Sequence, residues 1–542
     1  MIRRRHVPPL AGSGPPTSLA GLAGAVCVAA ATLLAGAPAA GQEPGFDVLV
    51  RGGTVVDGTG APPLRADVGI RGDRIAAVGD LSARSADRVI DATGLHVVPG
   101  FIDSHSHATW GLARDELRTA HALLAQGITT VLANPDGGGP VDLAAQRAAL
   151  EDPGVGVNVA QFVSHGSIRR EIMGMQAREA TPDELQMMRE LVHRGMAEGA
   201  IGLSSGLYYS PGSYAPTGEV IELAKVAGEY GGVYQSHIRD ESDYTIGVVA
   251  AVDEVIEIAR TAGVPGIVTH IKALGPRVWG ASKEIVEHIE TARRRGLEIY
   301  ADQYPYEASG TSIVGALVPR WALGGGTDAF RTRLADPGER ARLVADMWEN
   351  LDRRGGAGRL VLQEGALRGR SLADVARERG LDPVETAIRL LEEGAGTGLT
   401  SFNMDEGDIR ELMRQPWMMT SSDGILRTLD DGHPHPRDFG AFPRKIRRYV
   451  LEEGVVTLER AVRSMSGLPA EVYGIADRGT LAEGAFADVV VLDLEAFRDV
   501  ATYEDPNHLS KGVRHLFVNG AAAIDDGWFT DALAGAVLRK PR

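Results

Sequence analysis

The chain has 542 residues but only one cysteine, Cys27, which lies in an apolar N-terminal run. The rest of the chain can therefore form no disulfide, and a chain of this length buries enough core to fold without one. Aromatic residues make up only 5% of the chain, whereas glycine reaches 68 residues, which indicates many turns. Basic residues are also fewer than acidic ones, so the formal net charge is −16. Such an acidic chain is a poor partner for nucleic acid or an anionic membrane.

Residues 1–40 have the composition of a secretory signal peptide. Three arginines at residues 3–5 precede an uncharged apolar run over Leu19–Ala35, and Ala37–Ala39 offers a small-residue cleavage signal. A transmembrane anchor is the alternative, but the run is short and rich in alanine and glycine. We predict cleavage near Ala39/Ala40 and export to the periplasm or the exterior. Loss of three arginines then takes the net charge from −16 to about −19.

Segments near the two ends of the chain share a pattern of short alternating strands and glycine turns. Asp47–Gly53 near the N-terminus has this pattern, as do Val489–Leu492 and His515–Gly520 near the C-terminus. The shared pattern predicts one small β-sandwich domain built from both termini, over residues 41–98 and 467–542.

The middle of the chain, residues 99–466, alternates amphipathic helical patterns with short apolar strands. The clearest helix–strand units are Glu219–Tyr230 with Val233–Ser236, Gly247–Ala262 with Gly266–Thr269, and Lys283–Arg295 with Leu297–Tyr300. This αβ repeat predicts an α/β fold, a (β/α)8 TIM-like barrel. A doubly wound open sheet is the alternative. The charged helical stretch near residues 320–360 is expected to be an insertion on the barrel.

The sharpest local motif is a pair of histidines that follows an apolar strand. Residues 97–107 read VVPGFIDSHSH and end in His105 and His107. Alternate residues of a strand point to the same side, so both imidazoles can approach one metal ion. Barrel enzymes keep their active sites at the carboxyl ends of the strands. The motif predicts two metal ligands; two surface histidines in a loop are the alternative.

Three further strand ends carry residues able to do chemistry. His237 follows the strand Val233–Ser236, and His270 follows the next strand, Gly266–Thr269. Asp423 comes after the apolar run that begins at Trp417. A carboxylate there can take a proton from water activated by a metal and pass it to a leaving nitrogen. A structural histidine and a turn aspartate before glycine are the alternative interpretations.

Taken together, these residues resemble the amidohydrolase superfamily and, more narrowly, the N-acyl-D-amino-acid deacylases (D-aminoacylases). The resemblance covers nearly all of the chain after residue 40. Besides the two-histidine segment it includes the run GLSSGLYYSP at Gly202–Pro211, SHIR at Ser236–Arg239, HIK at His270–Lys272 and SSDG at Ser421–Gly424. The GLSSGL run points to the deacylase branch.

The resemblance implies a distorted (β/α)8 barrel with a small β domain and a zinc centre of one or two ions. It implies that His105 and His107 bind the first metal and that His237 and His270 bind the second. Asp423 is then the general base and acid. Lys272 and Arg239 are candidates to hold a substrate carboxylate, because a cation near the metal would orient an acid.

The chain departs from the deacylase pattern at one metal ligand. The deacylases carry a cysteine in a Gly-Asn-Cys-Gly setting after the second barrel strand, whereas the matching segment here, Thr130–Gly137, has none. Asp136 is the nearest residue that could bridge two metals instead. An oxygen bridge is harder than a thiolate and could accept other divalent ions. Gly202–Leu207 offers neither the lysine nor the glutamate that other branches use after the fourth strand.

Three functions are compatible with these observations. The first is hydrolysis of the amide bond of N-acyl-D-amino acids or related D-peptide-like small molecules. The second is cyclic amide hydrolysis, as in hydantoinases and dihydroorotases, which the missing lysine disfavours. The third is a secreted barrel that only binds ligand, which the missing cysteine suggests. The preference for D over L substrates depends on the resemblance alone.

Overall fold

A computed structural model describes residues 45–394 and 398–540. The predicted signal peptide lies outside the described residues. No helix in the described ranges is long and apolar enough to span a membrane.

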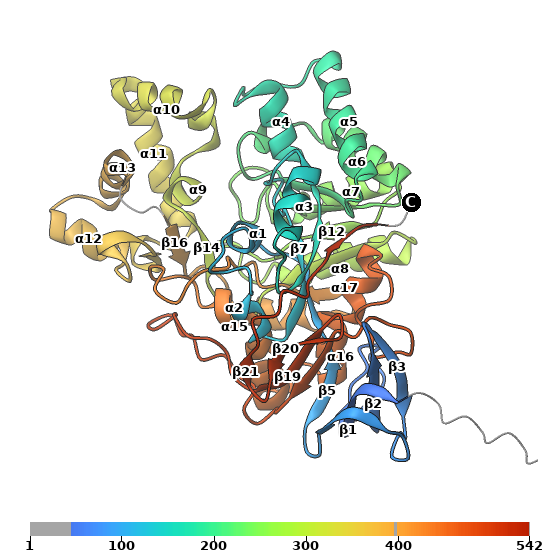
Figure 1. Ribbon diagram of the computed structural model, residues 1–542. Helices are drawn as coiled ribbons and strands as arrows, with labels where there is room; N and C mark the ends of the chain where they lie inside the picture. Colours follow the sequence, from blue (N-terminus) through green and yellow to red (C-terminus); the bar gives the residue numbers. More distant parts are fainter. Residues whose placement is uncertain (1–44, 395–397, 541–542) are drawn as a thin grey trace, which may run out of the picture. The chain divides into compact units, whose positions relative to one another are not determined.

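The small domain is built from both ends of the chain, as predicted, and its strands form one nine-stranded sheet. Blue N-terminal and red C-terminal strands lie side by side in it (Figure 1). Antiparallel pairing of β18 with β5 joins the two halves, and residues of both share one apolar core. The strands are β1 (Phe46–Val55), β2 (Leu64–Arg71), β3 (Arg74–Gly79), β4 (Ala86–Asp91), β5 (His96–Pro99), β18 (Val489–Leu492), β19 (Val513–Val518), β20 (Ala521–Asp525) and β21 (Trp528–Phe529).

Short parallel strands form the barrel in two hydrogen-bonded arcs. The arcs meet where the Ser422 amide donates to Asp103 Oδ1 and the Ser104 hydroxyl donates to the carbonyl of Thr420. The strands are β6 (Phe101–Asp103), β7 (Ile128–Ala133), β8 (Asn158–Gln161) continued by β9 (Val163–Ser164), β10 (Gly202–Gly206), β11 (Val233–His237), β12 (Gly266–Val268), β13 (Ile299–Gln303) and β17 (Met418–Thr420).

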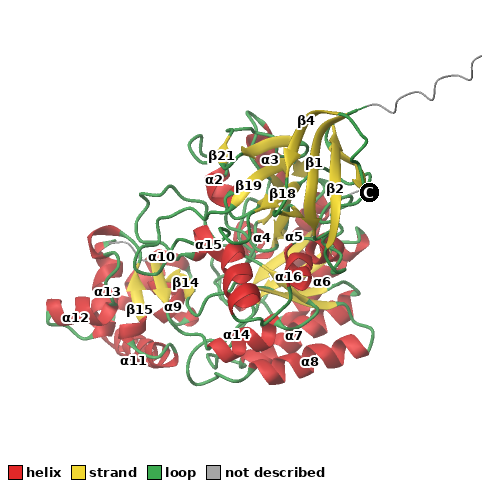
Figure 2. Cartoon of the chain, turned by 90° about the horizontal axis from the view of Figure 1, so that it is seen from below, coloured by secondary structure: helices red, strands yellow, loops and turns green. Residues whose placement is uncertain are grey.

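The three predicted helices are present and pack against each other beside the strands (Figure 2). Inside the barrel, one buried residue from each of several strands, such as Ile102, Leu132 and Met419, packs in a cluster closed by helix α17. The helices between and after the barrel strands are α1 (Thr109–Leu112), α2 (His121–Leu124), α3 (Leu143–Glu151), α4 (His165–Met173), α5 (Pro182–Ala197), η1 (Gly212–Tyr214), α6 (Thr217–Glu229), α7 (Val248–Ala262), α8 (Ser282–Arg294), α14 (Glu406–Met413), α15 (Arg437–Arg444), the π-helical η5 (Lys445–Glu452), α16 (Leu458–Met465) and α17 (Gly467–Tyr473).

Two boundaries differ from the sequence-based division. The range 467–542 also includes α17 and the short strand β22 (Val537–Leu538), which pairs in parallel with barrel strand β8. The segment of residues 97–103 is split at Gly100: β5 joins the small domain, while β6 begins the barrel. A Cβ on Gly100 would meet the Thr129 side chain at 2.1 Å, so the chain passes between the domains only with glycine here.

The insertion is larger than the stretch near 320–360 and contains its own sheet. Three antiparallel strands in the order β14–β16–β15 are surrounded by helices with a separate apolar core (Figures 1 and 2). Its elements are β14 (Ser309–Ser312), α9 (Ile313–Leu317), η2 (Arg320–Leu323), α10 (Gly326–Ala335), α11 (Pro337–Arg353), η3 (Ala357–Arg359), β15 (Leu360–Leu362), η4 (Gly365–Leu367), α12 (Leu372–Arg379), α13 (Pro383–Glu393) and β16 (Gly398–Ser401). We call these residues, 309–401, the insertion.

Candidate metal centre

The predicted ligands meet at one mouth of the barrel, at or just after the carboxyl ends of its strands. His237 is the last residue of β11, and His270 lies two residues after β12. His105 and His107 are not in a strand: they follow β6 by two and four residues. Hydrogen bonds hold this loop, because the His107 amide donates to the carbonyl of Gly424 and the Asp423 amide donates to that of His105. Strand alternation therefore does not orient the pair.

The first group of ligand atoms comprises His105, His107, Asp136 and Asp423, all within 4.8 Å of one another. His107 Nε2 lies 3.2 Å from Asp423 Oδ1 and 3.5 Å from Asp136 Oδ2. His105 Nε2 lies 3.3 Å from Asp136 Oδ1. Two imidazoles and two carboxylates form a donor set typical of zinc and similar divalent metals.

The second group comprises His237, His270 and again Asp136. His237 Nδ1 lies 2.9 Å from His270 Nε2, and each of these atoms faces Asp136 Oδ1, at 3.7 and 3.3 Å. Asp136 thus belongs to both groups, the position that the sequence suggested for a bridging carboxylate.

Backbone strain marks the same residues. Asp136, His270 and Asp423 all have positive φ, at 56°, 35° and 49°. Non-glycine residues rarely adopt this conformation, and where they do it is often at functional sites. The Asp136 loop is also held from behind, because a Cβ on Gly206 would meet the Asp136 carbonyl oxygen at 2.1 Å. The Gly-Leu-Ser-Ser-Gly run therefore supports the bridging residue rather than binding metal itself.

The buried polar atoms fit a divalent metal. Among the described residues, His105 Nε2 is buried and faces Asp136 at 3.3 Å without making a hydrogen bond of good geometry. Buried polar atoms normally have partners, and metal coordination is one way to supply them. The residues present can therefore hold one or two metal ions.

Electrostatics also draw positive charge into the centre. Burial alone would raise the pKa of Asp136, but the surrounding histidines, His105 first, hold it well below its usual range. Burial would lower the pKa of His107, yet its hydrogen bonds with Asp136 and Asp423 raise that pKa to about 9. A divalent cation supplies the same positive charge, and its binding would release protons from these histidines.

Asp423 has one oxygen directed at each of two partners. Oδ1 faces His107, while Oδ2 accepts a 2.6 Å hydrogen bond from Arg437 Nη1. Burial opposes ionisation, but Arg437 above all holds the pKa of Asp423 well below its usual value. The carboxylate is therefore ionised and oriented, as a general base requires.

Lys272, one of the two candidates to hold a substrate carboxylate, is buried and lines a cavity that also contains the metal ligands. Its ammonium donates to Glu241 and lies 2.8 Å from His270 Nδ1. Burial would lower the pKa of Lys272, but Glu241 outweighs it and the pKa is raised. Glu241 also lies 3.1 Å from His270 Nδ1, so it orients both a cation and a metal ligand.

Arg239 is a correction to the sequence-based site. Its guanidinium forms an ion pair with Glu254, with a shortest distance of 2.7 Å, and donates to the carbonyls of Ser213 and Ala215. Arg239 is not among the described residues that line the cavity. Its donors are already bonded to Glu254 and to these two carbonyls, so they are not available to a substrate carboxylate.

Sequence reasoning missed three other residues of the cavity. Arg437 and Tyr304 line it together with Lys272, and both cations lie over the Tyr304 ring, at 4.7 and 5.6 Å. Arg354 reaches it from the insertion. Arg437 lies in α15, which is far in sequence from every strand-end histidine, so its place in the site could not be predicted from residue spacing. The cavity has a volume of about 910 Å³.

Comparison with known proteins agrees with this geometry. The amidohydrolase family model matches residues 88–265 and 326–523. An N-acyl-D-glutamate deacylase of Alcaligenes xylosoxydans xylosoxydans is 38% identical over 504 residues, which is 88% of this chain and 94% of that protein. A D-aminoacylase of the same organism is 35% identical over 522 residues, 91% of this chain and 98% of that protein.

A solved structure gives the same result. The N-acyl-D-glutamate deacylase from Bordetella bronchiseptica, complexed with zinc and a phosphonate inhibitor, is 35% identical, with a TM-score of 0.78 over 92% of this chain and 100% of that chain. The whole length of that deacylase is thus matched by this chain, whose own candidate metal centre lies at the mouth of the barrel. The chain belongs to the amidohydrolase family and, within it, to the N-acyl-D-amino-acid deacylases.

Proposed function

We propose that the protein is a metal-dependent hydrolase that cleaves the linear amide bond of N-acyl-D-amino acids or related small D-peptide-like molecules. The observation that carries the proposal is the convergence of both ligand groups, Asp423 and two cations on one cavity. The relatives named for D-aminoacylase and N-acyl-D-glutamate deacylase activity support the substrate class.

Zinc is the proposed metal, as one or two ions, held by His105, His107, His237 and His270 with Asp136 between them. When bound, zinc supplies a Lewis acid that polarises the amide carbonyl and activates water. Because the shared ligand is a carboxylate oxygen rather than a thiolate, we expect the centre to accept other divalent ions as well.

The chain's own groups then divide the work. Asp423 Oδ1 takes a proton from the attacking water while Arg437 holds Oδ2. As the carbon–nitrogen bond breaks, the same oxygen returns the proton to the leaving nitrogen, which gives a free carboxylic acid and an amino acid. Lys272 and Arg437, which both lie over the Tyr304 ring, would hold the substrate carboxylate.

The two other hypotheses are not favoured. Relatives that span most of the chain bear the names of linear deacylases, which disfavours a cyclic amidase. The complete ligand set, with Asp136 where the cysteine is missing, disfavours a barrel that only binds ligand.

The test is a turnover screen of the zinc-loaded protein with matched N-acetyl-D- and N-acetyl-L-amino acids. We expect hydrolysis of the D series and a loss of about 10²–10⁴-fold in kcat for Asp423→Asn, with the metal content unchanged. No hydrolysis of either series, or an unchanged rate in the variant, would contradict the proposal.

We also propose export after cleavage near Ala39/Ala40, and no association with nucleic acid or stably with membranes. The three arginines and apolar run at the N-terminus support export, and the negative charge supports the rest. N-terminal sequencing of the protein from a periplasmic or culture fraction tests the cleavage: a mature chain that still begins at Met1 would contradict it.

A further inference from the structure

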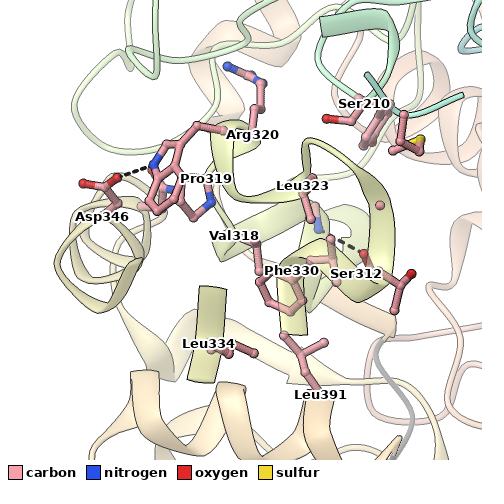
Figure 3. A pocket seen from close by; sticks show the side chains of 18 of the residues that line it. Ser210, Ser312, Val318, Pro319, Arg320, Leu323, Phe330, Leu334, Asp346 and Leu391 are labelled. Atoms are coloured by element: carbon pink, nitrogen blue, oxygen red, sulfur yellow. Dashed lines mark hydrogen bonds between the residues drawn. The ribbon is translucent and has the colours of Figure 1, made fainter. Parts of the chain in front are cut away.

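A second and larger cavity, of about 1190 Å³, lies between the barrel and the insertion. The insertion contributes to it an apolar wall of five residues, Val318, Leu323, Phe330, Leu334 and Leu391 (Figure 3), with charged residues such as Arg331, Asp346 and Glu392 beside that wall. Cavities of roughly 300–1,000 Å³ hold drug-sized ligands, so this space far exceeds what an acetyl group needs.

Helix α10 leaves part of its apolar surface exposed to the larger cavity. None of its residues, Gly326–Ala335, is fully buried, although Phe330 and Leu334 contact the core of the insertion. Both side chains line the cavity and are only half-buried. A ligand with apolar surface would cover them and remove that surface from water.

The larger cavity adjoins the metal centre. Five residues line both cavities: Arg170, Tyr208, Tyr209, Ser210 and Ser312. Among these, the Tyr209 ring centroid lies 4.6 Å from that of the ligand His237, and the Tyr208 ring centroid lies 5.5 Å from it. A substrate bound at the metals can therefore extend past this tyrosine pair into the larger cavity.

The tyrosine wall is fixed by both regions. The Tyr208 hydroxyl donates to the carbonyl of Gly315 in the insertion, at 2.8 Å, and Arg320 Nε donates to the carbonyl of Tyr208, also at 2.8 Å. The Arg320 guanidinium also lies 4.1 Å from the Tyr208 ring centroid. The passage therefore has a defined wall rather than a loose loop.

The position of the cations decides which part of a substrate enters. The amino-acid half leaves with the proton of Asp423, and its carboxylate is placed at Arg437 and Lys272 beside Tyr304. The tyrosine pair lies against His237 of the second ligand group, whereas Arg437 pairs with Asp423 of the first. A substrate whose carboxylate is held in this way would have its acyl half, on the other side of the scissile bond, directed toward the larger cavity.

We propose that the larger cavity is a subsite for the aliphatic chain of the N-acyl group, and that the protein prefers acyl chains of about eight or more carbons. The inference rests on the proposed amide hydrolysis and adds the class of acyl donor to it. Burial of one methylene is worth about fourfold in binding, so the preference rises with chain length until the cavity is filled.

The experiment compares kcat/KM for N-acetyl, N-hexanoyl and N-decanoyl derivatives of one D-amino acid. We expect N-decanoyl to exceed N-acetyl by at least about 100-fold, mainly through KM. In Phe330→Asp, a charge in the apolar wall should lower kcat/KM for N-decanoyl at least about tenfold and leave N-acetyl within about twofold.

Leu381→Asp is the matched control, because Leu381 is an exposed leucine of the insertion that lines neither cavity in the described chain. It should change neither substrate, and N-acetyl turnover reports that each variant is folded. Decanoate alone should inhibit N-acetyl hydrolysis by the wild type more strongly than acetate.

The outcomes separate the two proposals. Hydrolysis of the N-acetyl substrate with no gain from chain length, or equal effects of Phe330→Asp on both substrates, would overturn the acyl subsite alone. Failure to hydrolyse any N-acyl-D-amino acid would overturn the proposed function, and the subsite with it.

Discussion

The barrel mouth and the insertion differ in the kind of side chain that each buries. At the barrel mouth, charged groups are buried in pairs, such as Asp423 with Arg437 and Lys272 with Glu241. The insertion instead has its own apolar core and presents apolar side chains to the larger cavity. Buried charges orient reacting groups but tolerate little change, whereas an apolar wall selects by size and shape. In the proposed assignment, the barrel supplies the chemistry and the insertion selects the acyl group.

The largest effect is expected from Asp136→Asn, which changes the barrel mouth alone. Asparagine keeps the size of the side chain but offers one neutral oxygen, so the second ligand group loses its only carboxylate. Metal content should fall by at least one ion per chain, and kcat/KM should fall more than about 100-fold at fixed zinc. Metal analysis and kinetics together measure this.

The same variant tests whether the two regions are independent of each other. Decanoate binding, measured by calorimetry, should persist in Asp136→Asn because the apolar wall is unchanged. Loss of decanoate binding along with the metal would mean that the insertion depends on the metal centre for its shape.

Arg437→Lys should have a smaller effect on kcat/KM, at a residue that lies between the two regions. Arg437 pairs with Asp423, and a Cβ on Gly310 of strand β14 would lie 2.9 Å from its Nη2, so it touches barrel and insertion alike. Lysine keeps the charge but not the planar fork, so KM should rise about tenfold. An effect on kcat alone would contradict the role in holding the substrate carboxylate.

Much of this centre was predictable because its signals are local. His237 and His270 each follow a short apolar strand, and the barrel brings such ends together. The position of His105 and His107 was predicted for an incomplete reason, since backbone hydrogen bonds to Gly424 and from Asp423 hold their loop. Arg437 and the true extent of the insertion follow from tertiary contacts, which no spacing encodes. Arg239 was misplaced because sequence does not show that Glu254 takes its donors.

The smallest effect concerns a buried lysine between strand β17 and helix α16 and is seen in stability rather than activity. Lys445 is buried and donates to the hydroxyls of Thr420 and Ser464, at 2.7 and 2.8 Å. Burial lowers its pKa to about 7. In the unfolded chain the amine stays protonated up to about pH 10, so the unfolded state binds more protons between these values. The contribution of Lys445 to stability therefore rises with pH from about 7 to about 10 and is least favourable below pH 7.

Lys445→Met should remove that pH dependence. The two hydroxyl oxygens lie 3.1 Å apart and still pair with each other, so the variant leaves neither without a partner. Urea unfolding of both proteins at pH 6, 8 and 10 should show the variant relatively most stable at pH 6. A constant difference across the three pH values would contradict a depressed pKa.

The role proposed for the four histidines and Asp136 is to hold metal for amide hydrolysis. Its most direct test is the number of zinc ions per chain retained by the purified mature protein after loading and gel filtration. We expect between one and two ions in the wild type. Chelation should remove them together with N-acyl-D-amino-acid hydrolysis, and added zinc should restore both. Less than one ion per chain, or full hydrolysis by the metal-free protein, would contradict it.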